Sequence, residues 1–199
     1  MRHRCQDMEQ KCDISRLDTD GEAEVNVKKI YFDMDGVLAD FNRGVVELCG
    51  MKPMQPGKKL SPEEDDEMWE GIRKTGHFYD MLELMPGAKQ LFDTVYGLYG
   101  DRCEILTGIP KPKRGIVTAG EDKIRWVRRM LSKDVVVNIV YRHQKPEYCS
   151  GTDCILIDDL DQNILAWEEI GGTGILHTSV QETFAALEKL CVLSGGRKR

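Results

Sequence analysis

The amino-acid sequence predicts an α/β protein with a doubly wound parallel sheet, and three observations carry this prediction. First, short runs rich in β-branched and aromatic residues alternate along the chain with amphipathic helical patterns. This order is typical of parallel strands joined by helices that cover both faces of the sheet. Second, acidic or hydroxyl residues directly follow several of these runs, at the edge where open α/β sheets bind ligands. Third, a mostly helical segment interrupts the alternation directly after the first strong strand.

The stretch KKIYFDMDGVLADF at 28–41 supplies that first strand. Its apolar run at 30–32 has the composition of a buried strand. Asp33 and Asp35 follow, and period-two geometry places them on the same side of an extended chain. Gly36 then permits a turn that other residues resist. Because two close carboxylates repel each other, we expect a cation between them, most simply Mg²⁺.

Residues 43–84 are predicted to form a small helical insert after this strand. A short helix is expected at 41–50. The sequence SPEE at 61–64 is a strong helix start, with Ser as N-cap, Pro at the first helical position and Glu at the third. We expect that helix to reach about Lys74 and to end at Gly76.

The remainder of the chain continues the alternation of strands and helices. The helix at 122–131 is expected to place Ile124, Val127 and Leu131 on one apolar face. Ser179 and Glu182 have the spacing of a second capping box. The other elements are strands at 103–106, 135–140, 154–157 and 174–176 and helices at 87–99 and 162–170.

Composition narrows the class of protein. A chain of 199 residues is long enough for one domain with a good core, and a net charge of −6 argues against a general nucleic-acid binder. No apolar run approaches the length of a membrane span, and 1–24 lacks the apolar core of a signal peptide. The seven cysteines are odd in number and form no CxxC pair, so we expect free thiols, with Cys103 and Cys154 buried, in a reducing cytoplasm.

The sequence DMDGVL at 33–38 resembles motif I of the haloacid-dehalogenase-like (HAD) phosphohydrolases, DxDx[TV], and the longer DMDGVLADF is similar to their 5'(3')-deoxyribonucleotidase branch. The resemblance extends over roughly residues 27–190. It implies a HAD-like Rossmannoid core at 27–42 and 85–193, with the insert at 43–84 as a mobile C1 cap. The preceding residues, 1–26, are expected to form a flexible tail.

The resemblance also implies roles for the two acids of motif I. Asp33 would be the nucleophile, since a carboxylate is ionised at neutral pH and needs no base to attack phosphorus. Asp35 would be the general acid and base, and its backbone carbonyl would also bind Mg²⁺. The alternative for each residue is a turn or cap without a catalytic role.

Motifs II and III are expected at the ends of the next two strands. The Thr107 hydroxyl and the Gly108 amide could hold two phosphate oxygens. Lys145 would place its ammonium between nucleophile and phosphate and reduce their repulsion. A single Thr or Lys is a weak signal, because such residues often cap turns or lie in solvent. Arg142 and His143 are nearby alternatives to Lys145.

Two further acids, Asp158 and Asp159, follow the strand at 154–157 and resemble motif IV. Paired acids at a strand end suit a water-rich, octahedral Mg²⁺ site. By the family pattern Asp159 would bind the metal directly, and Asp158 would act through a water or a neighbouring ligand. Asp161 and Asn163 are interpreted as caps of the following helix.

The implied substrate is a small phosphate ester, most simply a (deoxy)nucleoside 5'-monophosphate. Phe41 matches the family position that lines the base pocket, and Lys111 matches a phosphate-contacting Lys, although its run KPKR can equally be a solvated basic loop. Sugar phosphates or 3'-phosphates are alternative substrates, and a non-catalytic binding module is the third hypothesis. No long nucleic acid or membrane is expected as a partner, and a homodimer is an open alternative to a monomer.

Overall fold

A five-stranded, fully parallel sheet forms the centre of the protein in the computed structural model, which describes residues 15–17, 23–53 and 60–193. The strand order is β5-β4-β3-β6-β7. The chain moves from β3 to β4 and β5 on one side and then to β6 and β7 on the other, so the switch point lies between β3 and β6. This topology confirms the predicted α/β class. The strands are β3 (Lys29–Phe32), β4 (Cys103–Gly108), β5 (Val136–Val140), β6 (Cys154–Asp158) and β7 (Thr173–Leu176).

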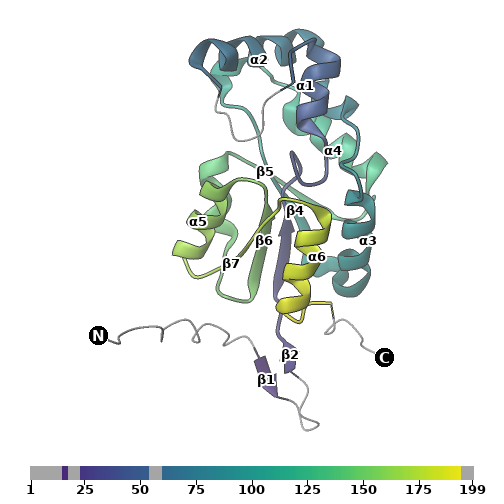
Figure 1. Ribbon diagram of the computed structural model, residues 1–199, viewed down its shortest axis with the longest axis vertical. Helices are drawn as coiled ribbons and strands as arrows, with labels where there is room; N and C mark the ends of the chain where they lie inside the picture. The colour runs from purple at the N-terminus through teal and green to yellow at the C-terminus, as the bar shows by residue number, and fades with distance from the viewer. Residues whose placement is uncertain (1–14, 18–22, 54–59, 194–199) are drawn as a thin grey trace, which may run out of the picture.

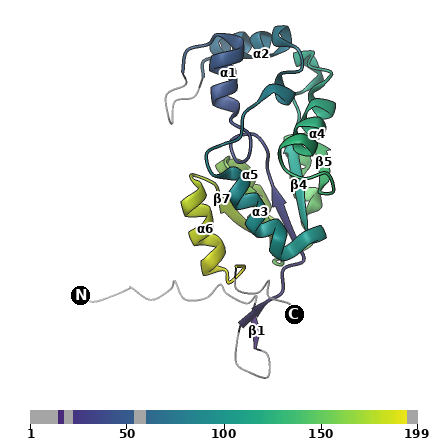
Figure 2. The same ribbon diagram turned by 90° about the vertical axis from the view of Figure 1, so that its right-hand side faces the viewer.

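Side chains that alternate along the strands divide the core between the two faces of the sheet. Ile30 and Phe32 of β3 belong to the larger buried cluster, whereas Tyr31 belongs to the smaller one. The smaller cluster is closed by Trp167, which is fully buried, from α5. The larger cluster includes side chains of α3, α4 and α6, and Figure 2 shows α3 beside α6. These helices are α3 (Ala88–Tyr99), α4 (Ala119–Met130), α5 (Asp161–Glu169) and α6 (Val180–Lys189).

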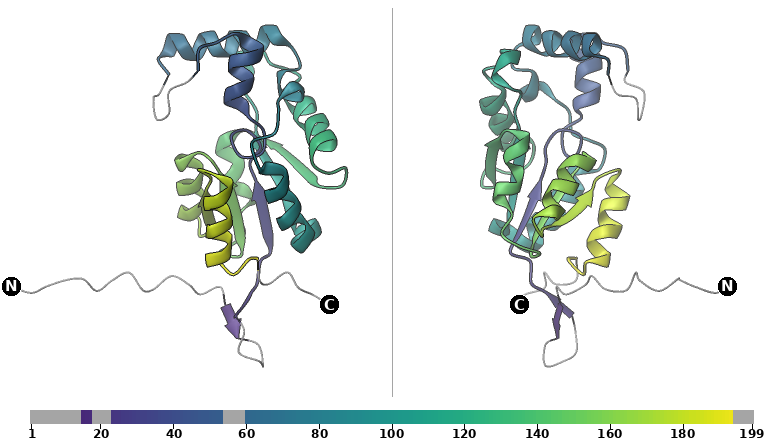
Figure 3. Two further views of the ribbon diagram at one scale, coloured as in Figure 1. Left: turned by 45° about the vertical axis from the view of Figure 1, so that its right-hand side comes forward. Right: turned by 90° about the vertical axis from the view of Figure 1, so that its left-hand side faces the viewer.

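The predicted insert contains α1 (Phe41–Cys49), α2 (Pro62–Thr75) and the 3₁₀ helix η1 (Phe78–Met81). Figures 1 and 3 show α1 and α2 beyond the carboxyl ends of the strands. The chains that enter and leave the insert lie side by side, since the Asp40 amide donates to the Glu83 carbonyl at 2.8 Å. The Met85 amide likewise donates to the Leu38 carbonyl at 2.9 Å. The chain therefore enters and leaves the insert through two segments that are hydrogen-bonded to each other.

Local sequence signals explain several element boundaries. At α2, the Ser61 hydroxyl accepts from the Glu64 amide and the Glu64 carboxylate accepts from the Ser61 amide, which confirms the predicted capping box. At α6, the Ser179 hydroxyl accepts from the Glu182 amide, but the reciprocal bond between these two residues is not formed, so Ser179 is a simple N-cap.

Helix α4 differs from its prediction in start and orientation. It begins at Ala119, three residues earlier than expected, and Ile124 is 38 % exposed rather than on the buried face. The buried side instead carries Trp126, whose indole donates to the Leu82 carbonyl at 2.7 Å, and Lys123. The prediction was therefore wrong for Ile124, whereas Val127 is buried as expected. The helix packs against η1 as well as against the sheet, which turns its buried side toward Trp126 and Lys123.

Two short strands, β1 (Ser15–Leu17) and β2 (Ala23–Val25), pair antiparallel within the segment predicted as a tail, and they lie at the opposite end of the molecule from α2 (Figure 1). The rest of that prediction, at 1–14 and 18–22, falls outside the described residues. None of the helices in the described ranges is long and apolar enough to cross a membrane. The remaining 3₁₀ helices are η2 (Gly100–Arg102), η3 (Pro112–Arg114) and η4 (Arg142–Tyr148).

Candidate active site

Three carboxylates meet where β3 and β6 end side by side. Phe32 pairs with Ile157 in the parallel ladder, and the Asp33 amide donates to the Ile157 carbonyl at 2.9 Å. This register places Asp33 next to Asp158 and Asp159, with one oxygen of each carboxylate within 4.8 Å of the others. The cluster lies at the switch point of the sheet, which is the position where α/β folds bind ligands.

Gly36 allows Asp159 to approach the turn that follows β3. Its φ of +79° lies in the left-handed region that favours glycine. A Cβ atom at this position would lie 2.3 Å from the Asp159 Oδ2 atom, well inside contact distance. The glycine therefore serves both the backbone turn and the position of the acid opposite it.

The ammonium of Lys145, from η4, lies between two of the acids. Its Nζ atom is 2.6 Å from Asp158 Oδ2 and 3.0 Å from Asp33 Oδ1, and the side chain is 2 % exposed. Burial alone lowers the pKa of Lys145, but the carboxylates of Asp33 and Asp158 raise it above its usual value. Lys145 is therefore charged at neutral pH.

Asp158 is fully engaged by its protein neighbours. Besides Lys145, it accepts from the Asn163 side-chain amide with both oxygens at 2.9 Å and from the Leu160 amide at 2.9 Å. The interpretation of Asn163 as a helix cap was wrong, because its amide holds this buried carboxylate instead. With its acceptor positions occupied, Asp158 is placed to orient Lys145 rather than to bind a cation through a free oxygen.

The electrostatics of this cluster favour a cation. Burial and repulsion from Asp33 and Asp158 raise the pKa of Asp159 to about 7. Burial and repulsion from Asp33 also raise the pKa of Asp158, although Lys145 acts in the opposite direction. Such shifts mean that the metal-free cluster resists ionisation and that a bound cation would relieve the repulsion.

A second buried ammonium, that of Lys123 in α4, lies beside Asp35. Its Nζ atom donates to Asp35 Oδ2 at 2.6 Å, to the Thr107 hydroxyl at 2.8 Å and to the Gly108 carbonyl at 2.8 Å. Burial raises the pKa of Asp35 and Asp33 adds to the shift, whereas Lys123 lowers it. Thr107 is fully buried and engaged by Lys123.

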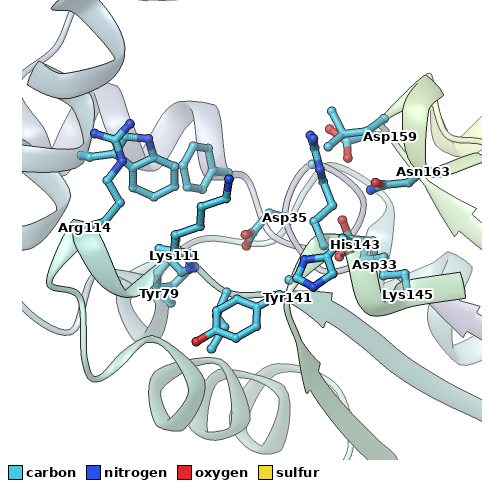
Figure 4. A pocket seen from close by; sticks show the side chains of 18 of the residues that line it. Asp33, Asp35, Tyr79, Lys111, Arg114, Tyr141, His143, Lys145, Asp159 and Asn163 are labelled. Atoms are coloured by element: carbon cyan, nitrogen blue, oxygen red, sulfur yellow. Dashed lines mark ion pairs between the residues drawn. The ribbon is translucent and has the colours of Figure 1, made fainter. Parts of the chain in front are cut away.

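These groups border a cavity of about 950 Å³. Asp33, Asp35, Lys145 and Asp159 form part of its wall, and Figure 4 shows Asp35 between this cluster and the opposite wall. That opposite wall carries aromatic and basic side chains, and Thr107 does not contribute to the lining. The residues of this wall include Phe41, Trp69, Tyr79, Lys111 and Arg114.

The basic loop after β4 also fastens the insert to the core. Arg114 pairs with Asp65 and Asp66 of α2, and its guanidinium lies 5.6 Å from the centre of the Trp69 ring. The Phe41 ring lies 6.5 Å from that of Trp69, centre to centre. Lys111, in contrast, has no acidic partner among the residues that the structure describes, so its charge is available to a ligand.

The donor set is compatible with Mg²⁺. The clustered atoms of Asp33, Asp158 and Asp159 are carboxylate oxygens, which Mg²⁺ prefers. Four carboxylates, from Asp33, Asp35, Asp158 and Asp159, lie beside two buried ammonium groups within the described residues. This excess of acids over ammonium groups is compatible with one divalent cation.

The structure therefore brings most of the predicted site residues together and adds two that sequence reasoning missed. Asp33, Asp35, Lys145, Asp158 and Asp159 share one centre, while Phe41, Gly108 and Lys111 line the cavity. Arg142 and His143, the alternatives to Lys145, line the cavity as well, and the His143 ring stacks on Tyr141. Neither the contact of Lys123 with Asp35 nor that of Asn163 with Asp158 follows from local sequence, because each depends on tertiary packing.

Fold and site define an α/β protein with an acidic centre at the switch point of its sheet and a helical insert beyond that centre. The same fold occurs in a crystal structure of a dehalogenase with an intermediate complex (TM-score 0.51, 10 % identity, 81 % of this chain and 97 % of that one). A second dehalogenase structure gives a TM-score of 0.50 at 10 % identity, with the same coverage. A HAD family hydrolase from Deinococcus radiodurans R1, with bound phosphate and sodium, gives 0.47 at 13 % identity, over 85 % of this chain and 98 % of that one.

The two dehalogenase similarities establish a shared fold, and identities this low say nothing further about the reaction. No protein-family model matches the chain, and a search of curated proteins finds no match. The inference about function therefore depends on the geometry of the site.

Proposed function

We propose that this protein is a Mg²⁺-dependent phosphomonoesterase of the HAD type that acts on a small phosphate ester. The observation that carries the proposal is the centre itself. Three carboxylates lie within 4.8 Å of one another, beside two buried ammonium groups and at the wall of a large cavity. Mg²⁺, held by Asp33, Asp159 and the Asp35 carbonyl, would neutralise charge on the phosphoryl oxygens.

The residues around the cavity can divide the reaction into two balanced steps. A carboxylate oxygen of Asp33 attacks phosphorus and forms an aspartyl phosphate, while the bond from phosphorus to the leaving oxygen breaks and Asp35 gives that oxygen a proton. Water then attacks phosphorus and gives a proton to Asp35, while the bond from phosphorus to the Asp33 oxygen breaks, so that inorganic phosphate is released and the Asp33 carboxylate is regenerated. Lys145 offsets the repulsion between the Asp33 carboxylate and the phosphate in both steps.

The far wall of the cavity supports a nucleoside monophosphate as substrate. Phe41 and Trp69 offer aromatic surface on which a base could stack, and Lys111 offers a cation without an acidic partner among the described residues. Sugar phosphates and 3'-phosphates remain the alternative esters. A non-catalytic module is disfavoured, because several acids kept close together at a cost in repulsion have no use without a cation and a reaction.

A panel of phosphate esters tests this proposal. We expect hydrolysis in the presence of Mg²⁺, abolition by EDTA, and the highest kcat/KM for nucleoside 5'-monophosphates. Preference for a sugar phosphate would contradict the proposed substrate but would agree with the proposed reaction. No hydrolysis of any ester, p-nitrophenyl phosphate included, would contradict the chemistry.

The variant Asp33→Asn provides the matched control for that assay. It should lower turnover by at least ~10³-fold, because an amide is a poor nucleophile toward phosphorus. A thermal unfolding curve should show that the variant remains folded. Normal turnover in this variant would exclude Asp33 as the nucleophile.

A further inference from the structure

The ammonium of Lys123 is fully buried and has no free donor. A lysine ammonium can donate three hydrogen bonds. Those of Lys123 go to Asp35 Oδ2, to the Thr107 hydroxyl and to the Gly108 carbonyl, at 2.6, 2.8 and 2.8 Å. The side chain is 0 % exposed, so it cannot turn toward solvent. Its charge is thus fixed in one place relative to the end of β4.

Besides these three acceptors, the Lys123 ammonium contacts an aromatic ring of the insert. The Nζ atom lies 4.6 Å from the centre of the Tyr79 ring, and Tyr79 belongs to η1 and is 1 % exposed. Such a contact between a cation and an aromatic face is attractive, and more so away from water. Lys123 therefore connects α4 and β4 of the core with the insert at the point where Asp35 projects.

The two oxygens of Asp35 have different surroundings. Oδ2 is held by Lys123, whereas Oδ1 is buried and has no hydrogen-bond partner within the part of the chain that the structure describes. Asp35 lines the cavity. One oxygen is thus an anchor, and the acceptor positions of the other are not used by any described residue.

We infer that Lys123 is a positioning residue that holds Asp35 by Oδ2 so that Oδ1 delivers the proton to the leaving oxygen. This inference rests on the proposed phosphomonoesterase function. In the step concerned, the bond from phosphorus to the leaving oxygen breaks, the bond to Asp33 forms, and the proton moves from Asp35 Oδ1 to the departing alcohol. Lys145 contacts the nucleophile instead, so the two lysines serve opposite ends of the scissile bond.

The test compares an ester that needs a general acid with one that does not. The variants are Lys123→Met and Lys123→Gln, and the esters are an alkyl phosphate and p-nitrophenyl phosphate, whose leaving group departs as a stable anion. We measure kcat/KM, which reports the step that forms the aspartyl phosphate. For the alkyl ester we expect a fall of about 100-fold, in the range that general acid catalysis contributes. For p-nitrophenyl phosphate we expect a fall of less than about fivefold, because the proton is dispensable there.

Two controls separate the role of Lys123 from a general effect on structure. In an Asp35→Asn background, Lys123→Met should have almost no further effect on the alkyl ester, since residues that act as a unit are non-additive. Lys89→Met, which removes an exposed lysine paired with Asp93 on α3, should leave both rates unchanged.

Each outcome decides the matter. Equal losses for both esters, or loss of folding in both Lys123 variants, would mean that the residue serves stability and would overturn the inference. Absence of phosphatase activity in the wild-type protein would instead overturn the proposed function. The two failures are therefore distinguishable.

Discussion

Lys123 and Lys145 are both buried ammonium groups at the same edge of the sheet, but their surroundings differ. Lys145 belongs to η4, and its ammonium lies between two carboxylates, those of Asp33 and Asp158. Lys123 belongs to α4, and its ammonium contacts one carboxylate, that of Asp35, together with a hydroxyl, a carbonyl and an aromatic ring. The first environment is ionic and belongs to the core, and the second is mixed and includes the insert.

This difference indicates that the two lysines act on different groups in the proposed reaction. The side around Lys145 concentrates charge, which suits a nucleophile, a cation and a phosphate. The side around Lys123 orients a single acid and touches the insert through Tyr79, which suits the leaving group. Variants of each side should therefore differ in their dependence on the leaving group.

The largest effect is expected from Lys145→Met. Because charge compensation at phosphorus does not depend on the leaving group, kcat/KM should fall by about 10³-fold for alkyl and p-nitrophenyl phosphates alike. Removal of one partner from a buried ion pair should also lower the free energy of unfolding by about 3 kcal/mol. Kinetics and urea unfolding measure both effects. A loss of kcat/KM for the alkyl ester alone would contradict the proposed difference in role between Lys145 and Lys123.

Gly36→Ala should weaken Mg²⁺ binding without a general effect on the fold. A Cβ atom 2.3 Å from Asp159 Oδ2 must displace that carboxylate, and the φ of +79° adds strain. We expect the dissociation constant for Mg²⁺ to rise roughly 30-fold, since loss of a residue that positions a metal ligand typically costs about 10- to 100-fold in affinity. Titration calorimetry measures it. Gly97→Ala is the control, because nothing lies within 4 Å of a Cβ there; unchanged affinity in Gly36→Ala would contradict the placement of Asp159.

The pH dependence of Mg²⁺ binding should follow Asp159, whose pKa is raised to about 7 by burial and by repulsion from Asp33 and Asp158. Protons and metal compete for this carboxylate, so affinity should fall about tenfold between pH 8 and pH 6. In the metal-free protein the sign for stability is the reverse. A carboxyl with a raised pKa binds more protons when folded, so its contribution to stability is lost as pH rises from about 4 through 7. Thermal unfolding with and without Mg²⁺ measures both trends, and Asp159→Asn should remove them.

The smallest effect is expected from loss of the Arg114 contacts between the loop after β4 and α2 of the insert. Arg114→Ala removes the ion pairs with Asp65 and Asp66 and the contact with Trp69. Partly exposed pairs contribute about 0.2–1 kcal/mol each, so we expect KM to rise about threefold with kcat nearly unchanged. Arg43→Ala, which removes an ion pair within α1, is the control. A fall in kcat that matches the rise in KM would assign Arg114 to the chemistry instead.

The sequence predicts the surroundings of Lys145 better than those of Lys123. Asp33 and Asp158 directly follow apolar runs, so local pattern alone places them at strand ends, and parallel pairing then brings them together. Lys123 lies on a helix whose buried face was predicted correctly at Val127 but wrongly at Ile124. The actual face is set by contacts of α4 with η1, a segment about 40 residues away in the chain, and periodicity cannot report such contacts. Asn163 was missed for a similar reason, since a residue near a helix start can either cap it or reach back to the preceding strand.

The most direct test of the central claim is the detection of a phosphoryl group on Asp33. The variant Asp35→Asn, incubated with p-nitrophenyl phosphate and Mg²⁺ and quenched in acid, should accumulate the intermediate, because this ester needs no proton and water lacks its base. Peptide mass spectrometry should then find one phosphoryl group on the peptide that contains Asp33, and none after treatment with EDTA. A phosphoryl group on another residue, or hydrolysis of the ester without any phosphorylated Asp33, would contradict the account.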